Sequence, residues 1–540
     1  MKKLLDRLLR TDSLLQLALF ASLAIYLQTA AFAFVYDDFG AIVMNPWLAS
    51  WHGLPQIFLH HSWAFMDFPV PARHYRPMFL VWLFAVRHVF APSPAWYHLC
   101  ALFTHLCAAC LAYRLAKVLL RDELGAAIAV VLFATHPTKV EAVAWISAVS
   151  DPLMAVFFFG AVLTYIRSRA RDGHCVPWAV ASFLCALAAL LTKETAAVLP
   201  GVILAYEWLF HEPGENKHHL LRLAGRVSPY LLADGLWLGA RFLVLRGAGD
   251  GLIPGSMKVT LLTMPAALWL YIRQLVWPVN LSALYPDTTV THFSVLHTVL
   301  PVAALVLLAA TYRMWSRRSA VLQFAGVWFL LTLAPVIYGF PWIQLHDRHL
   351  YLPSFAVALM LAVGIRQIKW PGQAHSERLQ VAGVMAIALL LSVVSAREAR
   401  AWDSELTVFT RAVSVSPRNV EAVTMLAQAQ ADNGEPRLAL ETLQNAVLLQ
   451  PESSRLVFTL GNSYYEGGDY VHARPLLEKL THMPSSADYR SCALYDLGMM
   501  ELQQNHYAAA KSLLRTAIKI APNMSGYQRI LDNLQRTHPQ

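Results

Sequence analysis

Long apolar segments recur throughout residues 1–397 of this 540-residue chain, and they limit its fold more than any other feature. A helix needs about 20 apolar residues to cross a bilayer, and the first such segment, residues 14–35, is followed by many others. Charged residues make up 14% of the chain, against about 25% in soluble proteins. Because backbone groups in lipid must be hydrogen-bonded within their own segment, the sequence predicts a bundle of transmembrane helices.

The positions of Lys and Arg predict which side of the membrane each loop faces, because basic residues concentrate in the short cytoplasmic loops of membrane proteins. Residues 258–278 are apolar enough to span, yet the basic clusters of the short loops all fall inside only if this segment lies along the interface. We therefore expect about eleven spans, a cytoplasmic N-terminus, and an outer location for loop 36–94 and the C-terminus; a spanning 258–278 stays an open alternative. Because the Lys and Arg residues set the membrane topology, the net positive charge does not indicate nucleic-acid binding. The predicted spans are 14–35, 95–116, 125–146, 152–167, 176–192, 195–211, 228–245, 297–312, 320–338, 351–365 and 379–396.

The composition changes near residue 398, where the chain becomes charged and rich in Ala and Leu. Leu-Ala or Leu-Gly pairs start at Leu426, Leu460 and Leu497, spaced 34 and then 37 residues apart. A period near 34 is typical of the tetratricopeptide repeat, whose helix pairs stack to bury a shared apolar face. The predicted fold class is therefore all-α, a multi-spanning bundle followed by a C-terminal tetratricopeptide solenoid. We predict a solenoid domain at 398–540, with repeats at about 420–453, 454–487 and 491–524 and a degenerate half repeat at 403–417.

Two adjacent carboxylates, Asp37 and Asp38, directly follow the first apolar segment. Acids at the mouth of a membrane helix are costly unless they face water, a partner or a substrate. Neighbouring carboxylates raise the pKa of one of the two, which can then act as a general base. The alternative is that the pair only marks where the helix meets water.

Further polar side chains stand at span ends that the predicted topology puts on the same outer side. Arg and Lys at the lipid boundary suit a phosphate. Transfer from a lipid-phosphate donor needs an acid that takes the proton of a hydroxyl and cations that hold the departing phosphate. These residues are of both kinds. Plain ion pairs at helix mouths remain the alternative for Lys193 with Glu194 and for Glu141 and Asp151. The residues are Tyr75, Arg76, His136, Glu141, Asp151, Lys193, Glu194 and Arg348.

An ordered set of motifs resembles the transmembrane and tetratricopeptide repeat-containing O-mannosyltransferases. The motifs keep their order from residue 36 to residue 354, and the repeats follow them, so the resemblance covers nearly the whole chain. Each motif is weak alone, whereas the ordered set is fairly specific. They are Tyr36-Asp37-Asp38-x-x-Ala41-Ile42-x-x-Asn45, His74-Tyr75-Arg76-Pro77-Met78, His136-Pro137-x-x-x-Glu141-Ala142-Val143-Ala144, Lys193-Glu194, Trp277-Pro278-x-x-Leu281-Ser282 and Arg348-x-Leu350-Tyr351-x-Pro353-Ser354.

The resemblance implies a GT-C-like fold and transfer of a sugar, mannose in the family, from a polyprenyl-phosphate donor to Ser or Thr of an extracytoplasmic protein. By position, Asp37 is the expected base, with Asp38 second. Neither a cofactor nor a divalent metal is expected, because monophosphate users in this class look metal-free. The donor phosphate would be held by Arg76, Lys193 and Arg348, and the substrate pocket would be formed by Tyr75, His136, Glu141, Asp151, Glu194 and Tyr351.

The short repeat array differs from the longer arrays of animal members and favours a bacterial inner-membrane protein with periplasmic catalytic loops. The repeats are expected to bind the acceptor protein in their groove. Two other functions stay open. A transporter or flippase would show inverted repeats with broken helices, and no clear symmetry is visible in 1–396. A non-catalytic assembly scaffold would not need acids and bases gathered on one face.

Overall fold

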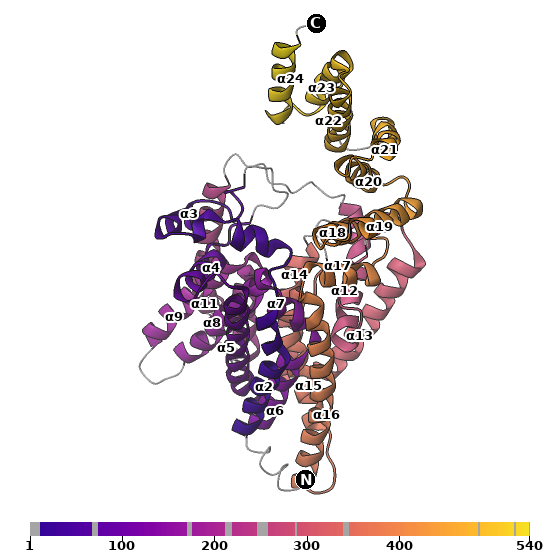
Figure 1. Cartoon of the computed structure of the whole chain (residues 1–540). Helices are drawn as coiled ribbons and strands as arrows, with labels where there is room; N and C mark the ends of the chain where they lie inside the picture. Colours follow the sequence, from indigo (N-terminus) through magenta and orange to yellow (C-terminus); the bar gives the residue numbers. More distant parts are fainter. Residues whose placement is uncertain are drawn as a thin grey trace. The chain divides into compact units, whose positions relative to one another are not determined.

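The computed structural model describes residues 11–66, 74–169, 175–210, 219–245, 257–286, 289–338, 345–483, 487–522 and 525–538. The regular elements of these residues are all helical (Figure 1), which confirms the predicted all-α class. The chain forms two compact units. The first, the membrane unit, comprises Met1–Ala283 and Thr288–Val408; the second, the repeat unit, comprises Leu284–Asp287 and Phe409–Gln540.

The membrane unit contains long helices joined by short 3-10 and π turns. Its α-helices are α2 (Thr11–Tyr26), α3 (Leu54–Leu59), α4 (Pro77–Val89), α5 (Pro94–Leu120), α6 (Glu123–Thr135), α7 (Val140–Ala144), α8 (Ser150–Ser168), α9 (Cys175–Thr192), α10 (Leu199–Phe210), α11 (His219–Val244), α12 (Met257–Val276), α13 (Leu300–Ser316), α14 (Ala320–Tyr338), α15 (Pro353–Gln367) and α16 (Gln373–Ala399). Its short turns are η1 (Leu27–Ala31), η2 (Phe39–Val43), η3 (Pro46–Leu48), η4 (Trp51–Gly53), η5 (Pro137–Lys139), η6 (Ile146–Val149), η7 (Glu194–Val198), η8 (Val295–Val299), η9 (Asp347–Leu350) and η10 (Arg400–Trp402).

By length and composition, eight helices among the described residues can cross a membrane, or nine if the bent pair Glu123–Thr135 and Pro137–Ala144 is one span. The expected number of about eleven is therefore not confirmed. The predicted spans 195–211 and 351–365 form the shorter helices α10 and α15, and α11, which covers 228–245, is not among the eight. Helix α12 is among them, so the segment that we expected at the interface also has the length and hydropathy of a span.

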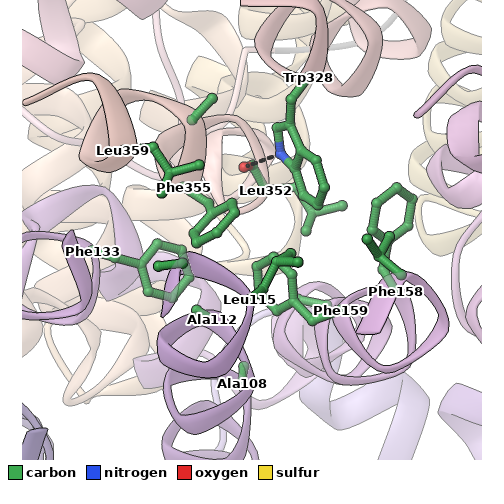
Figure 2. Close-up of a cluster of buried hydrophobic side chains, with 14 of the residues drawn as sticks. Ala108, Ala112, Leu115, Phe133, Phe158, Phe159, Trp328, Leu352, Phe355 and Leu359 are labelled. Atoms are coloured by element: carbon green, nitrogen blue, oxygen red, sulfur yellow. Dashed lines mark hydrogen bonds between the residues drawn. The ribbon is translucent and has the colours of Figure 1, made fainter. Parts of the chain in front are cut away.

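Aromatic side chains from α6, α8, α14 and α15 form the centre of the membrane unit, packed over the small residues of α5 (Figure 2). Ala108 and Ala112 let the helices approach closely, as small residues do in membrane bundles. The indole N–H of Trp328 donates to the carbonyl of Leu352 at 3.0 Å, which satisfies both groups in an apolar interior. This bond anchors the turn before α15, the turn that carries Arg348.

Several helices of this unit break at the polar residues that the sequence singled out. The bend between α6 and the segment after it is 59°, and it occurs at His136, whose backbone is extended (φ −69°, ψ 133°). Pro137 favours that extended conformation in the residue before it and cannot donate a helical hydrogen bond. Helix α9 likewise ends at an extended Lys193 (φ −157°, ψ 134°). Such breaks inside a membrane are tolerated only where they are buried in protein or line a cavity.

The repeat unit stacks helix pairs. The chain passes from the first unit to the second within α17 (Glu405–Val415). The helix pairs that follow are α18 (Val420–Asp432) with α19 (Pro436–Leu449), α20 (Ser454–Glu466) with α21 (Tyr470–His482), and α22 (Ala487–Gln503) with α23 (Tyr507–Ile520), and α24 (Ser525–Thr537) comes after them. Gly461 and Gly498 stand where paired helices touch. A Cβ at Gly461 would lie 3.1 Å from the side chain of Leu477, and one at Gly498 would lie 3.3 Å from Leu514.

Candidate active site

The adjacent acids follow a strained residue. Tyr36 has a φ of 55°, which is uncommon for any residue but glycine and is found where the surroundings hold the backbone in place. Its N–H donates to Glu405 Oε1 at 3.2 Å, and its ring lies 5.5 Å from that of Trp145. The contacts of Tyr36 therefore hold the turn directly before Asp37 in place.

Asp38 is fully buried and serves as an acceptor for three donors. Its Oδ2 accepts the N–H of Val35 at 3.2 Å, while Oδ1 accepts the N–H and the hydroxyl of Ser147 at 2.8 and 2.5 Å. Burial raises the pKa of Asp38 to about 7, against the hydrogen bonds from Ser147 and Val35, which lower it. Asp38 thus links the start of loop 36–94 to Ser147 in η6. Its neighbour Asp37 is only half-buried.

Arg76, at the start of α4, pairs with Glu194 at the start of η7. Its Nε donates to Glu194 Oε2 at 2.9 Å, and its Nη2 donates to Oε1 at 2.5 Å, so the pair is bidentate. The side chain of Arg76 is 19% exposed. Burial lowers the pKa of Arg76, but the Glu194 carboxylate more than offsets this and the pKa is raised. The predicted phosphate ligand is therefore charged, partly accessible and already paired with an acid.

Lys193 and Asp151 form the most enclosed pair. The Lys193 ammonium donates to both Asp151 oxygens, at 2.7 and 2.6 Å, and each side chain is 4% exposed. A neighbouring cavity of about 10 Å³, lined by this pair together with His349 and Leu352, has room for about one water. Lys193 spends two of its three N–H donors on Asp151.

Arg348, in η9, pairs with Glu141 in α7. Its Nη1 donates to Glu141 Oε1, and its backbone N–H donates to Oε2 at 3.0 Å. The guanidinium lies over the ring of Trp145, 4.9 Å from the centroid, a favourable cation–π arrangement. Nδ1 of His346 lies 3.1 Å from the same Glu141 oxygen. Arg348 is 18% exposed and so resembles Arg76 in access.

The three pairs and Asp37 share one electrostatic neighbourhood. Burial lowers the pKa of Lys193, Asp151 opposes that effect, and the charges of Arg76 and Arg348 lower the pKa further. The charge of Asp37 in turn helps to raise the pKa of Arg76. Charged residues from distant parts of the sequence therefore act on one another in the folded chain.

The remaining predicted pocket residues are engaged in contacts within the protein. The Tyr75 hydroxyl donates to the carbonyl of Phe58 at 3.1 Å. His136 Nε2 lies 3.1 Å from the carbonyl of Leu275, and the Thr138 N–H reaches its Nδ1 at 3.3 Å. The Tyr351 hydroxyl lies 2.7 Å from His105 Nδ1, and its side chain is fully buried. These contacts hold the broken helices together around the ion pairs.

Sequence reasoning missed a fourth basic side chain, Lys139. This side chain is fully buried, and its Nζ donates to the Ser354 hydroxyl and to the Tyr351 carbonyl, the latter at 3.4 Å. It also lies 4.6 Å from the centroid of the Phe133 ring. A lysine two residues after a proline within an apolar segment is itself a signal, because ionisable groups at membrane depth are functional candidates.

The described residues contain no group of three His, Cys, Asp or Glu side chains placed to hold a metal ion. Glu194, Asp151 and Glu141 are instead paired with Arg76, Lys193 and Arg348. A metal-free reaction remains a prediction.

Comparison with family models matches two stretches of the repeat unit. Residues 424–488 and residues 493–524 each match a tetratricopeptide repeat model. This confirms the repeats that the 34-residue spacing predicts.

Curated relatives extend over most of the chain. The protein O-mannosyl-transferase F38B6.6 of Caenorhabditis elegans is 26% identical over 460 residues, covering 82% of this chain and 64% of the relative. Tmtc3 of Drosophila melanogaster is 24% identical over 84% of this chain and 57% of the relative. Human TMTC3 is 25% identical over 82% of this chain and 52% of the relative. The chain thus spans between half and two thirds of the length of these relatives.

Among solved structures, the oligosaccharyltransferase of Archaeoglobus fulgidus, tethered with an acceptor peptide, covers 79% of this chain and 58% of its own, with a TM-score of 0.40 and 14% identity. The sequence relatives are more informative, because they match the membrane unit and the repeats in one alignment. The homologues of this chain are therefore protein O-mannosyl-transferases, the family that the ordered motifs indicate.

Proposed function

We propose that this chain is a membrane glycosyltransferase that moves a sugar, mannose by its relatives' name, from a polyprenyl-phosphate donor to a Ser or Thr hydroxyl of a protein. The observation that carries the proposal is the gathering of the Arg76, Lys193 and Arg348 ion pairs at the ends of broken apolar helices, with Asp37 near enough for its charge to raise the pKa of Arg76. A half-buried acid beside several cations suits a reaction in which a hydroxyl loses a proton and a phosphate departs.

In the proposed reaction, Asp37 takes the proton of the acceptor hydroxyl as its oxygen bonds to the anomeric carbon. The bond from that carbon to the phosphate oxygen breaks, and its electron pair leaves with the polyprenyl phosphate. The products are a glycosylated hydroxyl, a protonated Asp37 and the lipid monophosphate. Asp38 takes the role of a positioning residue, because its oxygens already hold Val35 and Ser147.

The cations differ in what they can offer the phosphate. An arginine carries five N–H donors. Arg76 uses two side-chain groups on Glu194, and Arg348 uses one on Glu141, so each keeps donors for a phosphate. Lys193 is more enclosed and spends two of three donors on Asp151. We therefore propose that the two arginines contact the phosphate. Lys193 would contribute positive charge without direct contact.

We further propose that the site faces away from the cytoplasm, in the periplasm if the chain is a bacterial inner-membrane protein. The placement of the basic loops supports this orientation. The acceptor would be an extended protein segment delivered through the repeat unit, since tetratricopeptide solenoids present binding surfaces for such segments.

The proposal is tested with the full-length protein in lipid nanodiscs, supplied with polyprenyl-phosphate mannose and a Ser/Thr peptide. Mass spectrometry should detect one added hexose that disappears when Ser and Thr are replaced by Ala. Nucleotide-linked mannose should not replace the lipid donor, and a chelator should leave the rate unchanged. Transfer from the nucleotide sugar alone, or none from any lipid donor, would reject the proposed donor class.

A further inference from the structure

The repeat unit contains a buried carboxylate that the proposed chemistry does not use. Asp496, on α22, is 7% exposed. Its Oδ2 has no hydrogen-bond partner among the residues that the structure describes. Buried polar atoms in native proteins are nearly always hydrogen-bonded, so an exception requires a physical explanation. A missing ligand that donates hydrogen bonds is one such explanation.

Tyrosine rings gather near this carboxylate. Burial and then the charge of Asp496 raise the pKa of Tyr495, its neighbour on α22, and of Tyr465 on α20. Tyr527 on α24 stacks on Tyr495 with 4.3 Å between centroids and 15° between planes, and its hydroxyl lies 3.4 Å from Cys492 Sγ. All of these rings are half-buried. Each therefore keeps part of its surface accessible to a ligand.

A second acid adds to the negative charge. Burial raises the pKa of Asp496 to about 7, and the nearby charge of Glu466 raises it further. Glu466 is exposed at the end of α20. The side chains involved come from α20, α22 and α24 (Figure 1), which are the first helices of successive pairs and the helix that follows them. In solenoids of this kind, corresponding helices form a continuous surface that binds partners.

We propose that Asp496, Glu466 and the three tyrosines form a site for a single cationic side chain, an arginine, of an extended peptide. The guanidinium stacks on aromatic faces and donates two parallel hydrogen bonds to one carboxylate, which matches stacked tyrosines beside an unpaired acid. Lysine would bind more weakly, because its compact ammonium neither stacks nor donates in a fork. The site rests on the proposed function only in identifying the peptide as the acceptor.

The test uses the full-length protein in detergent and three labelled Ala/Ser peptides that differ in one central residue, Arg, Lys or Gln. Fluorescence anisotropy should show that the Arg peptide binds about tenfold more tightly than the Gln peptide, with Lys between them. Asp496→Asn should reduce the preference to less than about twofold. Asp432→Asn, which changes an exposed acid on α18, is the matched control and should keep the full preference.

Glu466→Gln provides a variant that leaves the interior unaltered and should lower the Arg preference by about threefold. Thermal melting of each variant shows whether the solenoid is intact. Equal binding of the Arg and Gln peptides by the native protein would overturn the proposal, as would an undiminished preference in a folded Asp496→Asn variant. Because no sugar donor is present, a negative result leaves the transfer reaction unaffected, and failed transfer leaves this binding site intact.

Discussion

At the scale of single residues, the adjacent acids have different surroundings. Asp38 is enclosed by donors from Val35 and Ser147, whereas Asp37 is half-buried and its charge helps to raise the pKa of Arg76. The sequence placed the two together and ranked Asp37 first by resemblance alone. It could not show that Asp38 is held by Ser147, because the two are 109 positions apart. Which of the two acids is the base stays a prediction.

Asp38→Asn should destabilise the protein. The amide NH2 of Asn would face the backbone N–H of Val35 or of Ser147. Two donors cannot hydrogen-bond to each other, so a buried N–H would lose its acceptor, at a cost of roughly 1–3 kcal/mol. Thermal melting in nanodiscs measures the loss. Ser147→Ala, which removes one of the three donors, should cost less, about 1 kcal/mol. Equal melting of native protein and Asp38→Asn would contradict a structural role for this acid.

Asp38 also predicts a pH dependence of stability. Its folded pKa of about 7 lies above the ordinary 3.8, so between these values the folded protein binds the proton more tightly than the unfolded chain does. The resulting stabilisation is fully present below the ordinary pKa and is lost as the pH rises through about 7. The melting temperature should therefore fall between about pH 4 and pH 7 and level off above that range, and the fall should be smaller in Asp38→Asn. If the melting temperatures of both proteins fell equally with pH, protonation of Asp38 would not be the cause.

At the scale of elements, the site depends on helices that break at defined positions. Pro137 could be recognised in the sequence as a helix breaker, and the bend of 59° is found there. The pairing of each cation with a particular acid could not be foreseen, because Arg76 and Glu194, or Arg348 and Glu141, meet only through tertiary packing. The burial of Lys139 could not be foreseen either, because its partners, the Tyr351 carbonyl and the Ser354 hydroxyl at the start of α15, are distant in the sequence.

Trp328→Phe tests the anchoring of that turn. The change removes one of the two donors of the buried Leu352 carbonyl, which still accepts the N–H of Phe355 at 3.2 Å, and it removes part of a packed ring, so it should cost roughly 1–3 kcal/mol. Trp315→Phe is the matched control, because the Trp315 ring is 40% exposed and its indole donates to Gln367 at the surface. Melting curves of the two variants give the comparison. A similar loss in both would show that the bond to Leu352 contributes little.

At the scale of the whole molecule, hydropathy and repeat spacing were enough to predict an all-α membrane unit followed by tetratricopeptide repeats. They did not give the number of spans, because α10 and α15 are short and α12 is long enough to cross. Length and apolar character do not show whether a marginal helix crosses, since tilt and neighbouring helices also matter. The orientation of everything after α12 depends on that helix.

An alkaline phosphatase fusion after Gln540 decides the orientation. If α12 lies at the interface, the reporter is exported and active, as the basic-loop count predicts. A fusion after Arg169, the residue that follows α8, is the control and should be inactive, because that loop is predicted to be cytoplasmic. An inactive C-terminal fusion would place the later basic clusters outside and would contradict the predicted topology.

The central claim is that Asp37 takes the proton of the acceptor. It is tested by the kcat of Asp37→Asn for transfer from polyprenyl-phosphate mannose to a Ser/Thr peptide, since the variant keeps the shape of the side chain and removes its basicity. We predict a loss of about 10²- to 10⁴-fold with an unchanged melting temperature, while Asp432→Asn keeps the native rate. A folded Asp37→Asn protein that transfers mannose at the native rate would contradict the claim.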